Sequence, residues 1–113
     1  ETAILEIEKR LLESLGYKVD AVSDALDALE LFKANKKEYD LVITDMTMPR
    51  MTGAELSVEL LKIRPSLPII MCTGFSNRIN EKRAEVMGIR EFLTKPVLKK
   101  ELAQVVRKVL DQS

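Results

Sequence analysis

Histidine is absent from this sequence of 113 residues, and several common kinds of site are absent with it. Without an imidazole the chain has no histidine general base, no histidine nucleophile and no histidine-rich metal site. The single cysteine, Cys72, excludes a disulfide within the chain, so we expect a reduced, buried thiol. No apolar run approaches the roughly 18 residues that a membrane-spanning helix needs, and we expect a cytoplasmic protein without membrane contact.

The charges of the chain cancel, because Lys and Arg number 18 and Asp and Glu also number 18. A balanced chain lacks the basic excess that indicates binding to nucleic acid or to an anionic membrane surface, and we expect neither partner. The length suits one hydrophobic core, so we predict a single domain over residues 1–113.

The apolar residues alternate between helical and strand spacing along the whole chain. The predicted helices are one that Gly16 ends, one that Ser23 or Asp24 caps, one that a capping box at 52–55 opens and Pro65 ends, a polar one over about 77–87, and one with apolar residues at 102–110. The predicted strands are 17–22, 41–44, 68–73 and 91–94. This alternation predicts an α/β fold with a parallel sheet between two layers of helices. Such a fold should open on a strand, whereas this chain begins with a helix.

Three of the predicted strands end on a polar residue with a chemical use: Asp45, Thr73 and Lys95. Each of them alone is unremarkable, as a turn former, a loop start and a solvated charge. A parallel sheet, however, brings the carboxyl ends of its strands to one edge. A carboxylate nucleophile, a hydroxyl donor and a cation suit phosphoryl transfer. Since no glycine-rich loop is present, the anion is not expected to be a nucleotide phosphate.

The segments "DLVITDMTMPRMTG", "LPIIMCTGFS" and "GIREFLTKPV" follow one another in this order. With them, essentially the whole chain resembles a response-regulator receiver (CheY-like) domain of two-component signalling. The resemblance implies a flavodoxin-like, doubly wound parallel sheet in a three-layer α/β/α arrangement, with strand order 2-1-3-4-5. The first strand of that order, which is central, is missing from this sequence, so the domain is expected to be truncated at its N-terminus.

The resemblance also implies a role for particular residues. Asp45 matches the phospho-acceptor, Thr73 the hydroxyl that hydrogen-bonds the phosphoryl group, and Lys95 the lysine that pairs with it. Thr73 and Phe92 match the switch positions, and the backbone carbonyl of Thr47 matches a ligand of Mg²⁺ beside Asp45. Structural roles fall to Pro49, Gly53 and Pro96, the last in a peptide bond that is usually cis.

One departure from the family concerns the metal. The family carries an acidic pair at the end of its first strand, and these remaining acidic ligands of Mg²⁺ are absent from the chain. The sequence is therefore interpreted as a fragment, or as a domain whose first strand is supplied from elsewhere, for instance by strand swapping in a dimer.

The partners that the resemblance implies are a histidine kinase or phosphotransfer protein, and a downstream protein that reads the last two helices and the last strand. The domain is expected to catalyse only its own phosphorylation and dephosphorylation, either as a stand-alone regulator or as the C-terminal receiver of a hybrid sensor kinase. The main alternative is a phosphate-independent pseudo-receiver. A haloacid-dehalogenase-type phosphatase would need an acid where Thr47 stands, and a flavin-binding relative would need a phosphate-cradling loop.

Overall fold

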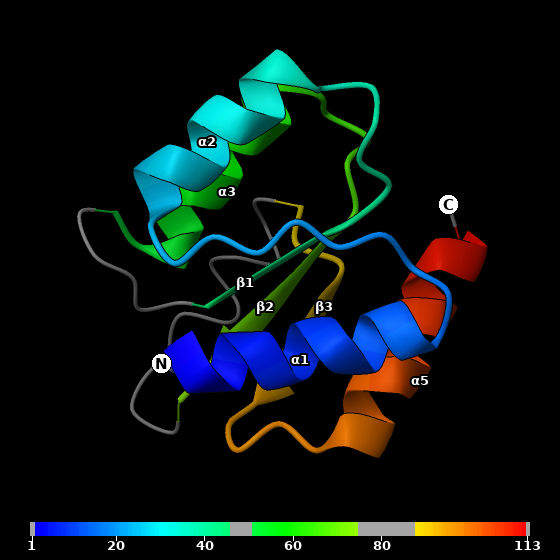
Figure 1. The fold of residues 1–113 in the computed structure, drawn as a ribbon. Coiled ribbons are helices and arrows are strands. Elements are labelled where there is room, and N and C mark those ends of the chain that lie inside the picture. The colour runs from blue at the N-terminus through cyan, green and yellow to red at the C-terminus, as the bar shows by residue number, and fades with distance from the viewer. Residues whose placement is uncertain (1, 46–50, 75–87, 113) are drawn as a thin grey trace.

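The computed structural model describes residues 2–45, 51–74 and 88–112. Its helices are α1 (Thr2–Ser14), α2 (Ala25–Ala34), α3 (Gly53–Ile63) and α5 (Lys99–Gln112). Its strands are β1 (Val42–Asp45), β2 (Ile69–Thr73) and β3 (Glu91–Thr94). Figure 1 shows the strands side by side between the helices. The predicted polar helix at about 77–87 lies outside the described residues.

The strands form one parallel sheet in the order β1-β2-β3. Asp45 pairs in register with Cys72 of β2, and Thr73 pairs with Thr94 of β3. Because all the strands run in the same direction, their carboxyl ends lie at one edge of the sheet. The predicted parallel α/β architecture is confirmed, and a sheet of three strands is consistent with the missing first strand.

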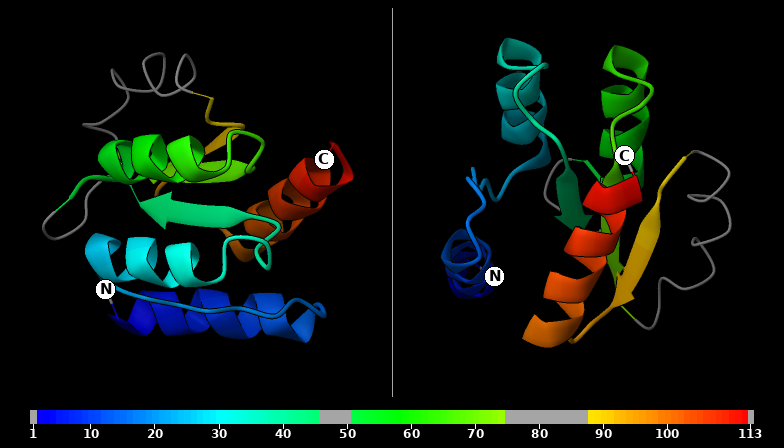
Figure 2. Two further views of the ribbon diagram at one scale, coloured as in Figure 1. Left: turned by 90° about the horizontal axis from the view of Figure 1, so that it is seen from above. Right: turned by 90° about the vertical axis from the view of Figure 1, so that its right-hand side faces the viewer.

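The helices cover the two faces of the sheet in pairs (Figure 2), with α2 beside α3 on one face and α1 beside α5 on the other. The central strand β2 is buried along its whole length and serves both layers. Ile69 and Met71 join the core cluster beneath α2 and α3, whereas Ile70 and Cys72 join the cluster beneath α1 and α5. Successive strand side chains point to opposite faces, so one continuous apolar run supplies two cores.

The helices begin and end where their local sequences indicate. Asp24 caps α2 and accepts a hydrogen bond from the N–H of Leu26 at 2.8 Å. Thr52 and Glu55 form the predicted capping box of α3, with reciprocal bonds of 3.1 and 2.9 Å. Gly16 follows α1 with a φ of +99°, a conformation that favours glycine.

The predicted strand at 17–22 is wrong as a strand. The structure places no β-ladder on these residues, which run from the end of α1 to the start of α2 without regular structure. A strand is stabilised by the neighbour to which it pairs, and an isolated extended segment has no ladder hydrogen bonds. In the strand order that the sequence predicts, the neighbour of this segment is the missing strand.

Candidate functional site

Asp45 and Lys95 meet at the carboxyl edge of the sheet. Asp45 is the last residue of β1, and Lys95 follows the end of β3 directly. Although β2 lies between their strands, the Lys95 Nζ is 3.4 Å from the Asp45 Oδ2. Their side chains are 40% and 39% exposed, so the pair is open to solvent. The sheet therefore holds a reachable carboxylate next to a fixed cation.

Thr73 ends the strand that separates the two charges, and it is fully buried. Its carbonyl accepts a hydrogen bond of 2.8 Å from the backbone N–H of Lys95. This bond continues the β2–β3 pairing for one residue beyond β3. It ties the backbone of Lys95 to the end of β2, and the lysine can then extend its side chain toward Asp45.

The other predicted site residues differ in what the structure describes of them. The Lys95–Pro96 peptide bond is cis, which is the form that the resemblance implies. Gly53 is the first residue of α3 and is buried. Phe92 lies in β3 in register with Met71, and it is partly buried against the cluster beneath α2 and α3. Thr47 and Pro49 lie outside the described residues.

Glu8 is a site residue that the pattern of the sequence did not single out. It is half-buried on the inner side of α1, one helical turn before the buried Leu12. Burial raises the pKa of its carboxyl, the charge of Asp45 raises it further, and Lys95 partly lowers it. The available signal is its spacing, because a glutamate at this position interrupts the apolar stripe of α1.

Cys72 lies directly behind the charged pair, in register with Asp45. Burial raises the pKa of its thiol to about 12, and the negative charges of Asp45 and Glu8 contribute in the same direction. The thiol is therefore protonated at neutral pH and inert as a nucleophile. The predicted reduced, buried cysteine is confirmed as a free, buried thiol.

A family model described as "Response regulator receiver domain" matches residues 1–107. The chain belongs to the response-regulator receiver family. A receiver domain of this family acts in two-component systems, where it interacts with histidine kinases and downstream effectors.

The receiver is similar to curated proteins of which it spans only a small part. It is 33% identical over 113 residues to "Transcriptional regulatory protein GlrR" of Escherichia coli (strain K12), covering 100% of this chain and 25% of that protein. It is 39% identical over 101 residues to "Sensor protein EvgS" of the same organism, covering 86% of this chain and 8% of that protein. A crystal structure of a response regulator receiver domain protein from Clostridium thermocellum matches with a TM-score of 0.95 and 34% identity, covering 99% of this chain and 89% of the other.

Receiver domains generally bind Mg²⁺ at their phosphorylation site, and the donors at this edge can be compared with that need. Asp45 presents a partly exposed carboxylate, the hard oxygen donor that Mg²⁺ prefers. Across residues 2–45, 51–74 and 88–112, no group of three or more His, Cys, Asp or Glu side chains could hold a metal. Mg²⁺ commonly takes one or two carboxylates and several waters, so Asp45 fits as an anchor for it.

In the described part of the receiver, no helix is both long enough and apolar enough to cross a membrane.

Proposed function

We propose that this receiver takes a phosphoryl group from a phosphohistidine of a histidine kinase or phosphotransfer protein onto the carboxylate of Asp45. The observation that carries the proposal is the Asp45–Lys95 pair, 3.4 Å apart at a solvent-exposed sheet edge. One carboxylate oxygen attacks the phosphorus and forms the new P–O bond. The P–N bond breaks, and its electron pair leaves with the imidazole nitrogen, which then takes up a proton. The product is an acyl phosphate on Asp45.

Lys95 is proposed to hold the negative oxygens of the transferred group. Phosphorylation increases the negative charge at the end of β1, and a phosphoryl group offers three strong acceptor oxygens. An ammonium that already lies within 3.4 Å of the carboxylate can pair with these oxygens after a small movement. We propose that the hydroxyl of Thr73, at the end of the neighbouring strand, donates to the same group.

We propose that Mg²⁺ binds at this edge through the Asp45 carboxylate and the backbone carbonyl of Thr47, with water in its other positions. When bound, the ion neutralises charge on the phosphoryl oxygens during transfer. The remaining work belongs to the protein: Asp45 supplies the attacking oxygen, and Lys95 holds the other charges in place.

The output of the domain is proposed to be a change of protein-interaction surface. If Thr73 turns toward the phosphoryl group, Phe92 can fill the volume that it leaves, because β2 and β3 are neighbours and Phe92 is only partly buried. The surface of β3 and α5 then changes, and we propose that a downstream protein reads it. On this proposal the domain catalyses only its own phosphorylation and dephosphorylation.

The test is incubation with acetyl phosphate and Mg²⁺, followed by intact-mass measurement. We expect a gain of one phosphoryl group that is stable in acid and lost in base. Asp45→Asn should abolish the gain, whereas the matched control Asp40→Asn, at the exposed start of the same chain segment, should keep it. The proposal is wrong if the wild-type chain gains no mass, which would favour a phosphate-independent module, or if Asp45→Asn is modified as fully as the wild type.

A further inference from the structure

The first observation concerns the backbone edge of β1. In a parallel ladder, alternate residues turn both their N–H and C=O groups toward the same neighbour. The N–H of Val42 donates to the carbonyl of Pro68 at 3.0 Å, so Val42 and then Thr44 face β2. Leu41 and Ile43 therefore turn their backbone groups to the other side, where the described residues form no strand. This side of β1 is an unpaired edge within the fold.

The second observation is the segment 17–22, which lies across from that edge. The N–H of Tyr17 bonds the carbonyl of Leu12 at 3.2 Å, and no backbone hydrogen bond is found for 18–22 within the described part of the chain. Val19, Ala21 and Val22 are nevertheless partly buried. The segment thus combines strand composition and burial with unused backbone groups, an unfavourable state that a partner strand would relieve.

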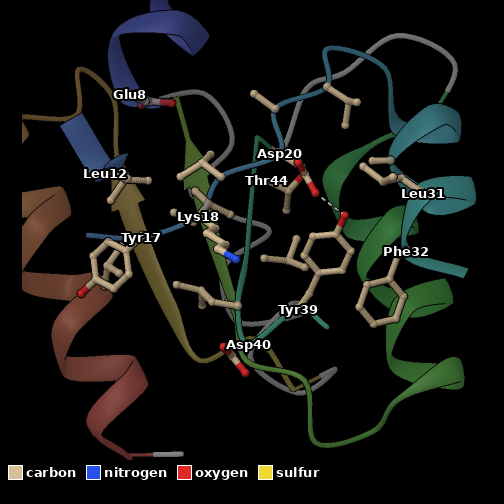
Figure 3. A pocket seen from close by; sticks show the side chains of 18 of the residues that line it. Glu8, Leu12, Tyr17, Lys18, Asp20, Leu31, Phe32, Tyr39, Asp40 and Thr44 are labelled. Atoms are coloured by element: carbon tan, nitrogen blue, oxygen red, sulfur yellow. Dashed lines mark hydrogen bonds between the residues drawn. The ribbon is translucent and has the colours of Figure 1, made fainter. Parts of the chain in front are cut away.

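The third observation is a cavity of about 460 Å³ between the two. Figure 3 shows side chains from 17–22 and from the start of β1 around it, joined at one place by the bond from the Tyr39 hydroxyl to Asp20. Its walls include Leu56 and Leu60 of one core layer. They also include Leu102 and Val106 of the other layer. A strand in this cavity would be covered on both faces.

We propose that the cavity is a strand-acceptor site, which binds an extended apolar segment of a partner polypeptide parallel to β1. One edge of the segment would pair with Leu41 and Ile43, and the other edge with residues 18–22. Addition of a strand to free sheet edges gives affinity through the main chain and specificity through side-chain pockets. The length of β1 and of 17–22 allows about five residues.

The walls define the chemistry of the bound segment. Since the cavity reaches both core layers, every side chain of the segment must be apolar, with β-branched residues preferred because they favour strands. The end of the cavity where β1 begins carries Glu38 and Asp40 among its lining residues, with Lys18 as the basic one. A basic residue at the amino end of the segment would complement that charge.

The test uses a synthetic peptide of two lysines followed by five alternating valines and isoleucines. Amide hydrogen exchange of the full chain is measured by NMR with and without it. We expect exchange at Leu41, Ile43 and Val19 to slow by at least about tenfold, together with a higher melting temperature. A control peptide that is N-methylated throughout its apolar part keeps the side chains and loses the donors, and it should give no protection.

A chain variant locates the binding independently. Ile43→Pro removes an N–H that faces the cavity and leaves the Val42 bond to β2 in place, as proline is tolerated at an edge. It should abolish the protection by the peptide. The proposal is overturned if the unmodified peptide protects none of these amides, if the N-methylated peptide acts equally well, or if the free chain already protects them as a dimer. No phosphoryl group takes part, so this outcome is independent of the phosphorylation test.

Discussion

Replacing Glu8 by leucine should stabilise the receiver, although the substitution lies at the edge of its candidate site. Glu8 is half-buried on the inner side of α1, one turn before Leu12, where the spacing of the helix calls for an apolar residue. Its burial raises the pKa of its carboxyl, and the nearby charge of Asp45 adds to this rise. Both contributions indicate that the folded chain disfavours a charged Glu8.

The magnitude follows from partial burial. Full burial of a leucine side chain contributes roughly 1.5–3 kcal/mol, and a half-buried position gives about half of that. Relief of the disfavoured charge adds a smaller amount, since the site keeps contact with water. We expect Glu8→Leu to raise the free energy of unfolding by about 1–2 kcal/mol, which corresponds to roughly 4–8 °C in Tm. The control is Glu6→Leu on the exposed side of the same helix, which should change stability by less than about 0.5 kcal/mol.

The pH dependence separates charge from packing. A carboxyl whose pKa is raised in the folded state contributes stability that is present below its unfolded value and is lost as the pH rises through the folded value. The model value for Glu8 is 4.5 and its folded pKa is higher. The advantage of Glu8→Leu should therefore grow as the pH rises above 4.5. Urea unfolding followed by circular dichroism from pH 4 to 7 measures it, and a constant difference, or a loss of stability at pH 7, would refute this reasoning.

Three further substitutions or modifications test local features. Leu98 precedes α5, is 65% exposed and offers no side-chain oxygen to the helix, so Leu98→Ser should stabilise the chain by about 1 kcal/mol in urea unfolding. Arg64 donates through Nη1 to the carbonyls of Lys36 and Tyr39, which ties the end of α3 to the turn after α2, and Arg64→Ala should cost about 1–2 kcal/mol in the same assay. The thiol of Cys72, with a pKa of about 12, should react with iodoacetamide at pH 8 far more slowly in the native chain than in urea, and equal rates would contradict its burial.

The parts of the fold that follow from local sequence were predicted correctly. The capping box at Thr52, the cap at Asp24 and the apolar run of β2 each carry enough local information to place an element. The segment 17–22 has the same kind of strand composition and forms no ladder. Its conformation depends on a neighbour distant in the sequence, which composition cannot supply.

The candidate site shows the same division. Strand-end positions and parallel topology predict that Asp45 and Lys95 share one edge, and the two lie 3.4 Å apart there. The proximity of Glu8 could not be obtained in this way, because it depends on how α1 lies against the sheet. A glutamate on a helix is usually solvated, and only its position within the apolar stripe distinguished it.

The alternation along β2 has a consequence for combining mutations. Met71 and Cys72 are adjacent in sequence, yet their side chains belong to core clusters on opposite faces of the sheet. Residues that share no packing partner usually have additive effects on stability. Substitutions in the layer of α2 and α3 should therefore combine almost independently with those in the layer of α1 and α5. The two faces of this receiver can vary separately in evolution or design, each constrained by its own helices and linked through a single strand.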